Sequence, residues 1–227
     1  MNKTAEKKIA ALRAATYVHS GMTLGLGTGS TAYFAIEAIG QAWQAGTLTD
    51  LRAVATSEAT AQQAGTYGIP LVELTDVDTI DLTIDGADEF DPQLRLIKGG
   101  GGALFREKLV AYCSKEMIVI SDHSKQVETL GDFPLPIEVV PKALRLVQNE
   151  LSERGYPANL RKQQNEATYV TDNGNFILDC PLQSITDPAA LDLELQQIPG
   201  ILETGLFLNL ATKIIVGQGD SFIEIDP

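Results

Sequence analysis

Four consecutive glycines, Gly99–Gly102, lie between Lys98 and a helical pattern that carries Glu107. Each glycine within a regular element costs about 1 kcal/mol relative to alanine, so the run predicts a loop whose backbone closely approaches another group. We expect that group to be a substrate oxygen, because loop amides and the Lys98 ammonium can stabilise developing negative charge. Glu107 could then act as a base over the same space. Taken alone, it is more often a surface glutamate favoured by the helix dipole.

A second segment, GLGTGSTA, joins a strand pattern to a helix pattern and predicts a phosphate site. The amides of Thr28–Thr31 would lie at the helix N-terminus, where unpaired N–H groups favour an anion, and Ser30 and Thr31 add hydroxyl donors. The alternative is a tight turn without a ligand. The glycine spacing differs from the dinucleotide fingerprint, and no lysine follows the last glycine as in a Walker motif.

Acidic residues follow the next apolar strand pattern in the segment IDGADEF, which contains Asp85, Asp88 and Glu89. Carboxylates this close together repel, so we expect a raised pKa for at least one of them, or neutralisation by a lysine. Such a cluster suits acid–base chemistry on hydroxyl groups. Two alternatives stay open, namely a solvated acidic turn, which we expect for Glu89, and a Mg²⁺ site that includes a substrate phosphate.

A fourth segment, SDHSKQV, places Lys125 where it could meet an anion after another strand. Asp122 and Ser124 are typical of a turn or a cap, and His123 is interpreted as a loop imidazole. The hydroxyls of Thr56–Thr60 also follow a strand, and helix N-capping is their expected role.

The elements that must position these segments alternate between short apolar runs and helical patterns. This order predicts an α/β fold with a doubly wound, mainly parallel, Rossmann-like sheet, whose strands end at the four clusters. The expected strands cover 22–27, 51–55, 69–74, 80–84 and 117–120, and the expected helices cover 31–44, 58–67 and 103–114. A first helix is expected to begin at an N-cap on Thr4.

After residue 131 the order of patterns approximates β-α-β-β-α-β, which is the ferredoxin-like split motif. We therefore predict a ferredoxin-like α+β domain over residues 131–206 and an α/β catalytic domain over 1–130 plus 207–227. Asn173-Gly174 indicates a type I′ hairpin turn, and Asp187 with Pro188 indicates a helix start. The last hairpin is expected to return to the first sheet.

The composition excludes several classes of function. The net charge is −13, and no basic run with interleaved aromatics is present, so nucleic acid is not an expected partner. The N-terminal segment lacks the apolar core of a signal peptide, and no apolar run could span a bilayer, so we expect a cytoplasmic protein without membrane contact. Cys113 and Cys180 are isolated and are expected to be small buried hydrophobes, and two histidines cannot assemble a familiar zinc pattern.

Taken together, GLGTGSTA, DGADE, KGGGGA followed by REK, and D-x-SK resemble the A-type ribose-5-phosphate isomerases. The likeness extends to FPLPIEVVP, TDNGN and GLF, and it covers nearly the whole chain. The resemblance implies reversible conversion of D-ribose 5-phosphate to D-ribulose 5-phosphate in the non-oxidative pentose phosphate pathway. It also implies a homodimer or homotetramer, with no metal and no organic cofactor.

By motif position, Glu107 matches the proton acceptor of that family, and Asp85, Asp88 and Lys98 complete the implied catalytic group. The implied substrate-binding residues are Thr28, Gly29, Ser30, Thr31, Asp85, Gly86, Ala87, Asp88, Lys98, Gly99, Gly100, Gly101 and Lys125. Lys7 is a weaker match to the phosphate site, and His123 occupies a variable position.

Two other classes of function are weighed against this one. A sugar-phosphate sensing module would share the fold, but the chain offers no segment for a DNA-binding helix-turn-helix. A nucleotide-binding oxidoreductase would need a different glycine spacing and an acidic residue after the second strand, where only Glu58 is available.

Overall fold

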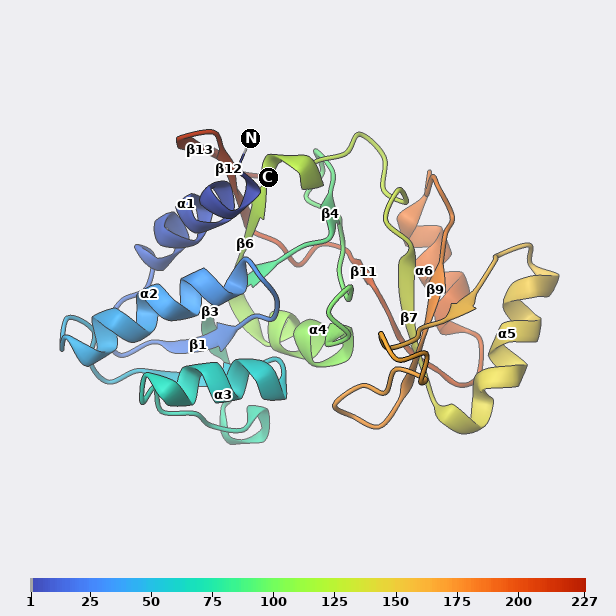
Figure 1. Ribbon diagram of the computed structural model, residues 1–227, viewed down its shortest axis with the longest axis horizontal. Coiled ribbons are helices and arrows are strands. Elements are labelled where there is room, and N and C mark those ends of the chain that lie inside the picture. Colours follow the sequence, from blue (N-terminus) through green and yellow to red (C-terminus); the bar gives the residue numbers. More distant parts are fainter. Residues whose placement is uncertain (1) are drawn as a thin grey trace. The chain divides into compact units, whose positions relative to one another are not determined.

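The computed structural model describes residues 2–227, and the chain divides into two compact units (Figure 1). The first unit contains the chain up to Ala87, Arg106–Lys125 and Asn209–Pro227, and the second contains Asp88–Phe105 and Gln126–Leu208. Residues 88–105, which we assigned to the first domain, thus pack with the second unit. The division into folding domains at 131 and 206 stays a prediction.

The first unit is built on a six-stranded sheet with the order β13-β12-β6-β3-β1-β2. Five strands are parallel, and β13 pairs antiparallel with β12 at one edge, so the last hairpin joins this sheet as predicted. The strands are β1 Thr23–Leu26, β2 Arg52–Ala55, β3 Ile80–Gly86, β6 Ser114–Asp122, β12 Lys213–Gln218 and β13 Ser221–Ile225.

Helices pack against both faces of this sheet. Its helices are α1 Lys3–Ala15, α2 Ala32–Gln44, α3 Glu58–Thr66 and α4 Leu104–Tyr112. Leu24 and Leu26 of β1 share a core with α1, α2 and α3, whereas Gly25, which points to the opposite face, is covered by Val110 of α4. Because side chains alternate along a strand, this arrangement confirms the doubly wound fold.

Two details of the first unit differ from the prediction. The N-cap of α1 is Asn2, whose side chain accepts the amides of Thr4 and Ala5, so the prediction of a cap at Thr4 was wrong by two residues. The strand expected over 69–74 is also wrong. Leu71 forms only an isolated bridge to Ala53, because Pro70 has no N–H to donate and a 3₁₀ turn follows at Leu74–Asp76.

The second unit contains the predicted ferredoxin-like motif. Its antiparallel sheet has the order β10-β7-β9-β8 and carries two helices. The elements are β7 Leu135–Val139, α5 Leu144–Glu153, β8 Asn159–Leu160, β9 Phe176–Cys180, α6 Pro188–Gln196 and β10 Ile201–Thr204. The Asp187 carboxylate accepts the Ala190 amide at 3.0 Å, which confirms the predicted start of α6.

The turn at Asn173-Gly174 is not type I′. That turn needs a positive φ at both central residues, and here only Gly174 has one, at +78°. The cause is a buried carboxylate on β7. Oε1 of Glu138 accepts from the Thr171 hydroxyl at 2.9 Å and the Asn175 amide at 3.0 Å, which holds the turn side chains toward the sheet.

A small three-stranded sheet in the second unit positions the four-glycine loop. Its order is β11-β5-β4, with β4 Glu89–Phe90, β5 Leu96–Ile97 and β11 Leu206–Phe207. Lys98 follows β5 directly, so the loop begins from a buried strand end. Elsewhere in the molecule, no helix among residues 2–227 combines the length and apolar character needed to cross a membrane.

Candidate active site

The turn from β1 to α2 has the local geometry of an anion site. Gly29 has a φ of +112°, and a Cβ at Gly27 would lie 2.1 Å from Oδ1 of Asp85, so both positions require glycine. Thr31 caps α2 without a side-chain hydrogen bond to the helix amides. The first amides of a helix have no carbonyl one turn earlier, so this N-terminus can receive an anion.

Three hydroxyl groups after β2 support this turn. Oγ1 of Thr28 lies 2.7, 2.9 and 3.1 Å from the side-chain oxygens of Thr56, Ser57 and Thr60. Ser57 also accepts the Thr60 amide, which confirms the N-capping role expected of this segment. The link to Thr28 was missed from the sequence, because it arises from the parallel pairing of β1 with β2.

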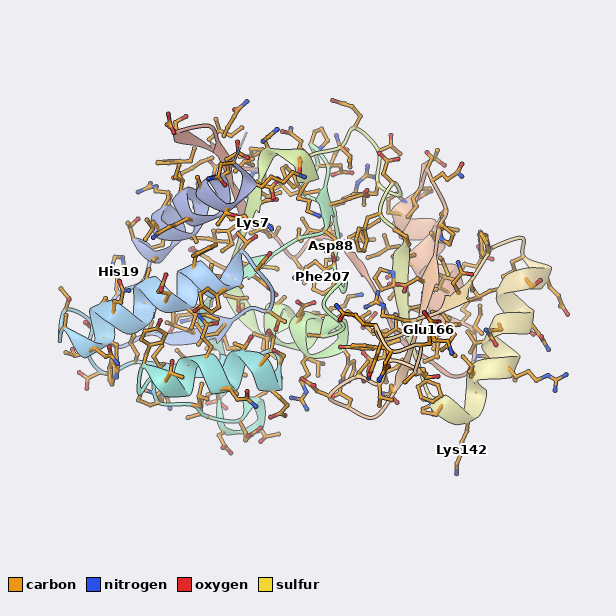
Figure 2. The ribbon with its side chains drawn as sticks, viewed as in Figure 1. Lys7, His19, Asp88, Lys142, Glu166 and Phe207 are labelled. Atoms are coloured by element: carbon orange, nitrogen blue, oxygen red, sulfur yellow. The ribbon has the colours of Figure 1, made fainter. Side chains whose placement is uncertain are left out.

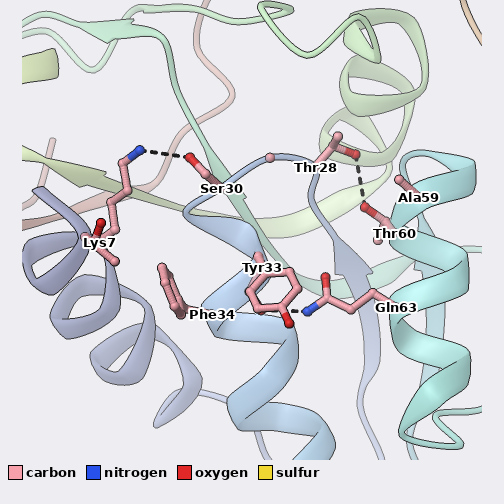
Figure 3. Close-up of a pocket in the computed structure, with 10 residues that line it drawn as sticks. Lys7, Thr28, Ser30, Tyr33, Phe34, Ala59, Thr60 and Gln63 are labelled. Atoms are coloured by element: carbon pink, nitrogen blue, oxygen red, sulfur yellow. Dashed lines mark hydrogen bonds between the residues drawn. The ribbon is translucent and has the colours of Figure 1, made fainter.

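Lys7 reaches the same turn from α1 (Figure 3). Its Nζ donates to Oγ of Ser30 at 2.8 Å. Both residues line a cavity of about 700 Å³, which is within the range of small-molecule sites. The lining residues are Thr4, Lys7, Thr28, Gly29, Ser30, Tyr33, Phe34, Ala59, Thr60 and Gln63. The weak sequence match for Lys7 is therefore accompanied by direct contact with the turn.

Asp85 and Glu107 are buried carboxylates of the first unit. Asp85 is fully buried at the end of β3, and its Oδ1 accepts the amides of Thr28 at 3.0 Å and Gly86 at 2.7 Å. Glu107 on α4 is only 4% exposed, so its alternative interpretation as a surface glutamate is wrong. A buried carboxylate is less hydrated than one in water, which suits a general base.

In the second unit, hydrogen bonds from several segments hold the four-glycine loop. Lys98 is 2% exposed, with Nζ 5.4 Å from the ring centre of Phe207. The carboxylate of Asp88 accepts the Gly100 amide at 2.7 Å, and the Gly102 amide donates to Gly99 at 2.9 Å. Figure 2 labels Asp88 and Phe207. The amide of Gly100, one of the residues expected to bind a substrate, is thus engaged by Asp88.

Two residues that the sequence analysis did not identify also bind this loop. Nη1 of Arg161 donates to the Gly99 carbonyl at 2.8 Å while its guanidinium pairs with Asp179. The Tyr169 hydroxyl donates to the Gly101 carbonyl at 3.2 Å, and a Cβ at Gly102 would lie 2.1 Å from that hydroxyl. No local signal identifies Arg161 or Tyr169, because they lie 62 and 68 residues beyond the glycines that they bind.

Glu89 corrects the expectation of a solvated acidic turn. It is 4% exposed, and its carboxylate accepts the amides of Gly131, at 2.8 Å, and Phe133. Glu89 is therefore a structural residue that fixes the segment before β7. Among the other predicted binding residues, Gly86 ends β3, Ala87 is the last residue of that stretch of the first unit, and Lys125 ends the 3₁₀ helix His123–Lys125.

The cysteines take no part in these arrangements. Burial raises the pKa of the Cys180 thiol to about 12, so it is inert at neutral pH. Cys113 is half-buried and packs against the small core of Val54, Ile80 and Val110. The interpretation as small hydrophobic residues is confirmed for Cys180.

The fold and the position of these groups first define a class. The sheet is open and mainly parallel, and a glycine-rich turn and buried carboxylates lie where its strands end, which is the arrangement of α/β proteins that bind ligands at that edge. The sequence profile described as ribose 5-phosphate isomerase A (phosphoriboisomerase A) matches residues 52–221. The chain belongs to this family.

Individual relatives match nearly the full length. The ribose-5-phosphate isomerase A of Parvibaculum lavamentivorans is 47% identical over 99% of this chain and 100% of its own, and that of Listeria monocytogenes is 47% identical over 97% of each. A structure of D-ribose-5-phosphate isomerase in complex with phospho-erythronic acid has a TM-score of 0.97 at 40% identity, covering all of both chains. The enzyme from Methanocaldococcus jannaschii has a TM-score of 0.92 at 39% identity, covering 97% of this chain and 98% of its own.

Proposed function

We propose that this protein is an aldose–ketose isomerase that interconverts D-ribose 5-phosphate and D-ribulose 5-phosphate in the non-oxidative pentose phosphate pathway. The observation that carries the proposal is the match over nearly the full length of relatives that bear this activity in their names. The local chemistry agrees with it, because an anion-binding turn and buried carboxylates are what a sugar phosphate and a proton transfer require.

The phosphoryl group is proposed to bind at the N-terminus of α2. Lys7 and Ser30 are already hydrogen-bonded to each other there, and the amides of Gly29, Ser30 and Thr31 would add further hydrogen-bond donors at the positive end of the helix dipole, whereas the Thr28 amide is held by Asp85. Lys125 is proposed as a second cation for the same group. Local donors can bind an anion despite the net charge of −13, because bulk charge is screened over about 8 Å at physiological salt.

Glu107 is proposed as the base. In the open-chain aldose it removes the proton from C2 while the carbonyl oxygen on C1 gains a proton, which gives an enediol. It then returns a proton to C1 while the oxygen on C2 loses one, so the product is the ketose and no electron leaves the sugar. The burial of Glu107 supports this role, because water that would compete for the proton is excluded.

Lys98, Asp85 and Asp88 are proposed to stabilise charge on the oxygens of the sugar and to transfer protons between them. The Lys98 ammonium would stabilise the enediolate, since two of the loop amides already have partners. Asp85 and Asp88 would move protons between hydroxyl oxygens and assist ring opening. The phospho-erythronic acid of the similar structure carries a phosphoryl group and a carboxylate, which is the charge pattern of a phosphorylated enediolate.

This route needs no metal and no organic cofactor, because the hydrogen moves as a proton through one carboxylate. We also propose a cytoplasmic homodimer or homotetramer, which the resemblance to the family supports. Light scattering after size-exclusion chromatography measures that assembly.

Incubation with ribose 5-phosphate in D₂O tests the activity and the proton route together. We expect ribulose 5-phosphate to form with deuterium at C1, because a carboxylate exchanges its proton with solvent before returning it. Ketose formation without any deuterium at C1 would contradict the exchangeable enediol route. The absence of any ketose would contradict the proposed function.

A further inference from the structure

The carboxylate of Glu6 joins three segments of the first unit. Glu6 is 1% exposed on α1, immediately before Lys7. Its Oε1 accepts the amide of Gly219, in the turn between β12 and β13, at 2.9 Å. Its Oε2 lies 2.7 Å from Nδ1 of His123, in the 3₁₀ helix after β6. Because a carboxylate only accepts hydrogen bonds, Nδ1 of His123 carries the proton.

This carboxylate has little freedom to move. A Cβ at Gly217 would lie 2.0 Å from the Glu6 carbonyl oxygen, so the start of α1 is seated directly on the backbone of β12. The Gly219 amide, followed by the bond from His123, holds the pKa of the Glu6 carboxyl below its usual range, although burial and Asp122 act in the opposite direction. Glu6 is therefore an ionised, buried anchor at neutral pH.

The segment that carries His123 is also held in place. Asp122, at the end of β6, is 1% exposed, and its Oδ1 accepts the Ser124 amide at 3.1 Å and the Ser124 hydroxyl at 2.5 Å. These bonds fix the 3₁₀ helix that ends at Lys125. His123 ties this 3₁₀ helix to Glu6 on α1, so the earlier interpretation of His123 as a plain loop imidazole is incomplete.

The same cluster has the composition of a metal site, since ligand atoms of Glu6, Asp122 and His123 lie within 4.8 Å of one another. Both oxygens of Glu6 and one oxygen of Asp122 already accept hydrogen bonds. A hydrogen-bonded network therefore accounts for the cluster without an ion.

We propose that Glu6 and His123 are positioning residues for phosphate binding. They hold Lys7, on α1, and Lys125, on the 3₁₀ helix, in the arrangement that receives the phosphoryl group. The inference rests on the proposed function, because that function assigns the phosphate to these two lysines. Neither Glu6 nor His123 is among the described residues that line the cavity beside Lys7, so we expect their removal to affect binding of the phosphoryl end rather than the proton transfer.

The test compares His123→Ala with His123→Asn in two measurements, calorimetric titration with inorganic phosphate and steady-state kinetics with ribose 5-phosphate. For the alanine variant we expect Kd and KM to rise about tenfold while kcat changes less than about twofold, which is the signature of lost uniform binding. Asparagine retains a donor for Glu6 and restores most of the affinity. Glu6→Gln is expected to behave like the alanine variant.

His19→Ala is the matched control. His19 is exposed and lies beyond the end of α1 that is remote from Lys7 (Figure 2), so both constants should stay unchanged. Unchanged phosphate affinity in His123→Ala overturns the inference. The inference is also overturned if the alanine and asparagine variants lose phosphate affinity equally and in proportion to the fall in their melting temperatures. If the phosphate affinity falls on substitution of His123 but the wild-type protein forms no ketose, the inference is upheld and the proposed function is contradicted.

Discussion

The two glycine-rich loops of this protein are built in different ways. The turn over Gly25–Thr31 is held by its own sheet, since Asp85 comes from the neighbouring β3 and the hydroxyls near Thr56 follow the neighbouring β2. The loop over Gly99–Gly102 is held by Asp88 and by two side chains 62 and 68 residues further along, Arg161 and Tyr169. Glycine is necessary in both because another group occupies the space of a side chain.

This difference separates two tasks. In the first loop the Thr28 amide binds Asp85 and the Tyr33 amide binds the Gly29 carbonyl, while Thr31 makes no side-chain cap, which leaves the amides of Gly29, Ser30 and Thr31 as the donors in this described segment that an anion could reach. In the second loop the carbonyls of Gly99 and Gly101 and the amide of Gly100 have protein partners. The first loop therefore suits binding of a phosphoryl group, and the second suits rigid placement of Lys98. Five predictions test this contrast, ordered from the largest expected effect to the smallest.

Glu107→Gln gives the reference loss of kcat against which the loop variants are compared, because Glu107 belongs to neither loop. We expect kcat to fall by about 10²- to 10⁴-fold with KM nearly unchanged, since glutamine keeps the shape but cannot accept the proton. Steady-state kinetics measure this, with the exposed Glu116→Gln as control. A near-normal kcat would remove Glu107 from the role of base.

Lys98→Met tests the task of the second loop. Methionine retains the packing near Phe207 but loses the charge, so we expect kcat to fall by about 10²- to 10³-fold, as for loss of one oxyanion donor. Phosphate affinity should hardly change. If Lys98→Met instead lost phosphate affinity and kept its kcat, the proposed difference in task between the two loops would be wrong.

Gly27→Ala tests the first loop. The new methyl group would meet the Asp85 carboxylate at 2.1 Å, so we expect the free energy of unfolding to fall by about 1–3 kcal/mol and phosphate to bind more weakly. Chemical denaturation and calorimetry measure both effects. Gly65→Ala on α3 is the control, because nothing lies within 4 Å of its Cβ position, and that change should be neutral or stabilising.

Arg161→Ala tests the long-range support of the second loop. It removes the bond to the Gly99 carbonyl and leaves Asp179 without its guanidinium partner, so we expect a loss of about 1–2 kcal/mol in unfolding free energy. We expect kcat to fall by about tenfold, since Lys98 loses rigid support. Normal kcat with reduced stability would show that the loop keeps its shape without Arg161.

The smallest expected effect is that of EDTA. Because the proposed route moves protons through side chains alone, activity should be the same before and after treatment with the chelator. Loss of activity that Mg²⁺ restores would assign the Asp85 and Asp88 segment to metal binding and would require a different account of both loops.

Predictions from the sequence were accurate where a pattern depends on near neighbours. The strand-to-helix turn at Gly25–Thr31, the cap at Asp187 and the ferredoxin-like order of elements agree with the structure, because turn chemistry and periodicity act within a few residues. The expected strand over 69–74 failed because Pro70 removes a donor at a sheet edge. The type I′ turn failed because Glu138 binds the turn from another strand.

The sequence by itself determined the two loops, the charged residues that follow buried strands and the family to which they belong. Only the tertiary structure decided which of those charges are buried and what each one binds. Glu89 was expected in a solvated turn, yet it accepts the amides of Gly131 and Phe133, and Glu6 accepts the amide of Gly219 from the other end of the chain. The physical reason is that a buried carboxylate must find donors wherever packing brings them, and packing is set by the whole core rather than by neighbours in sequence.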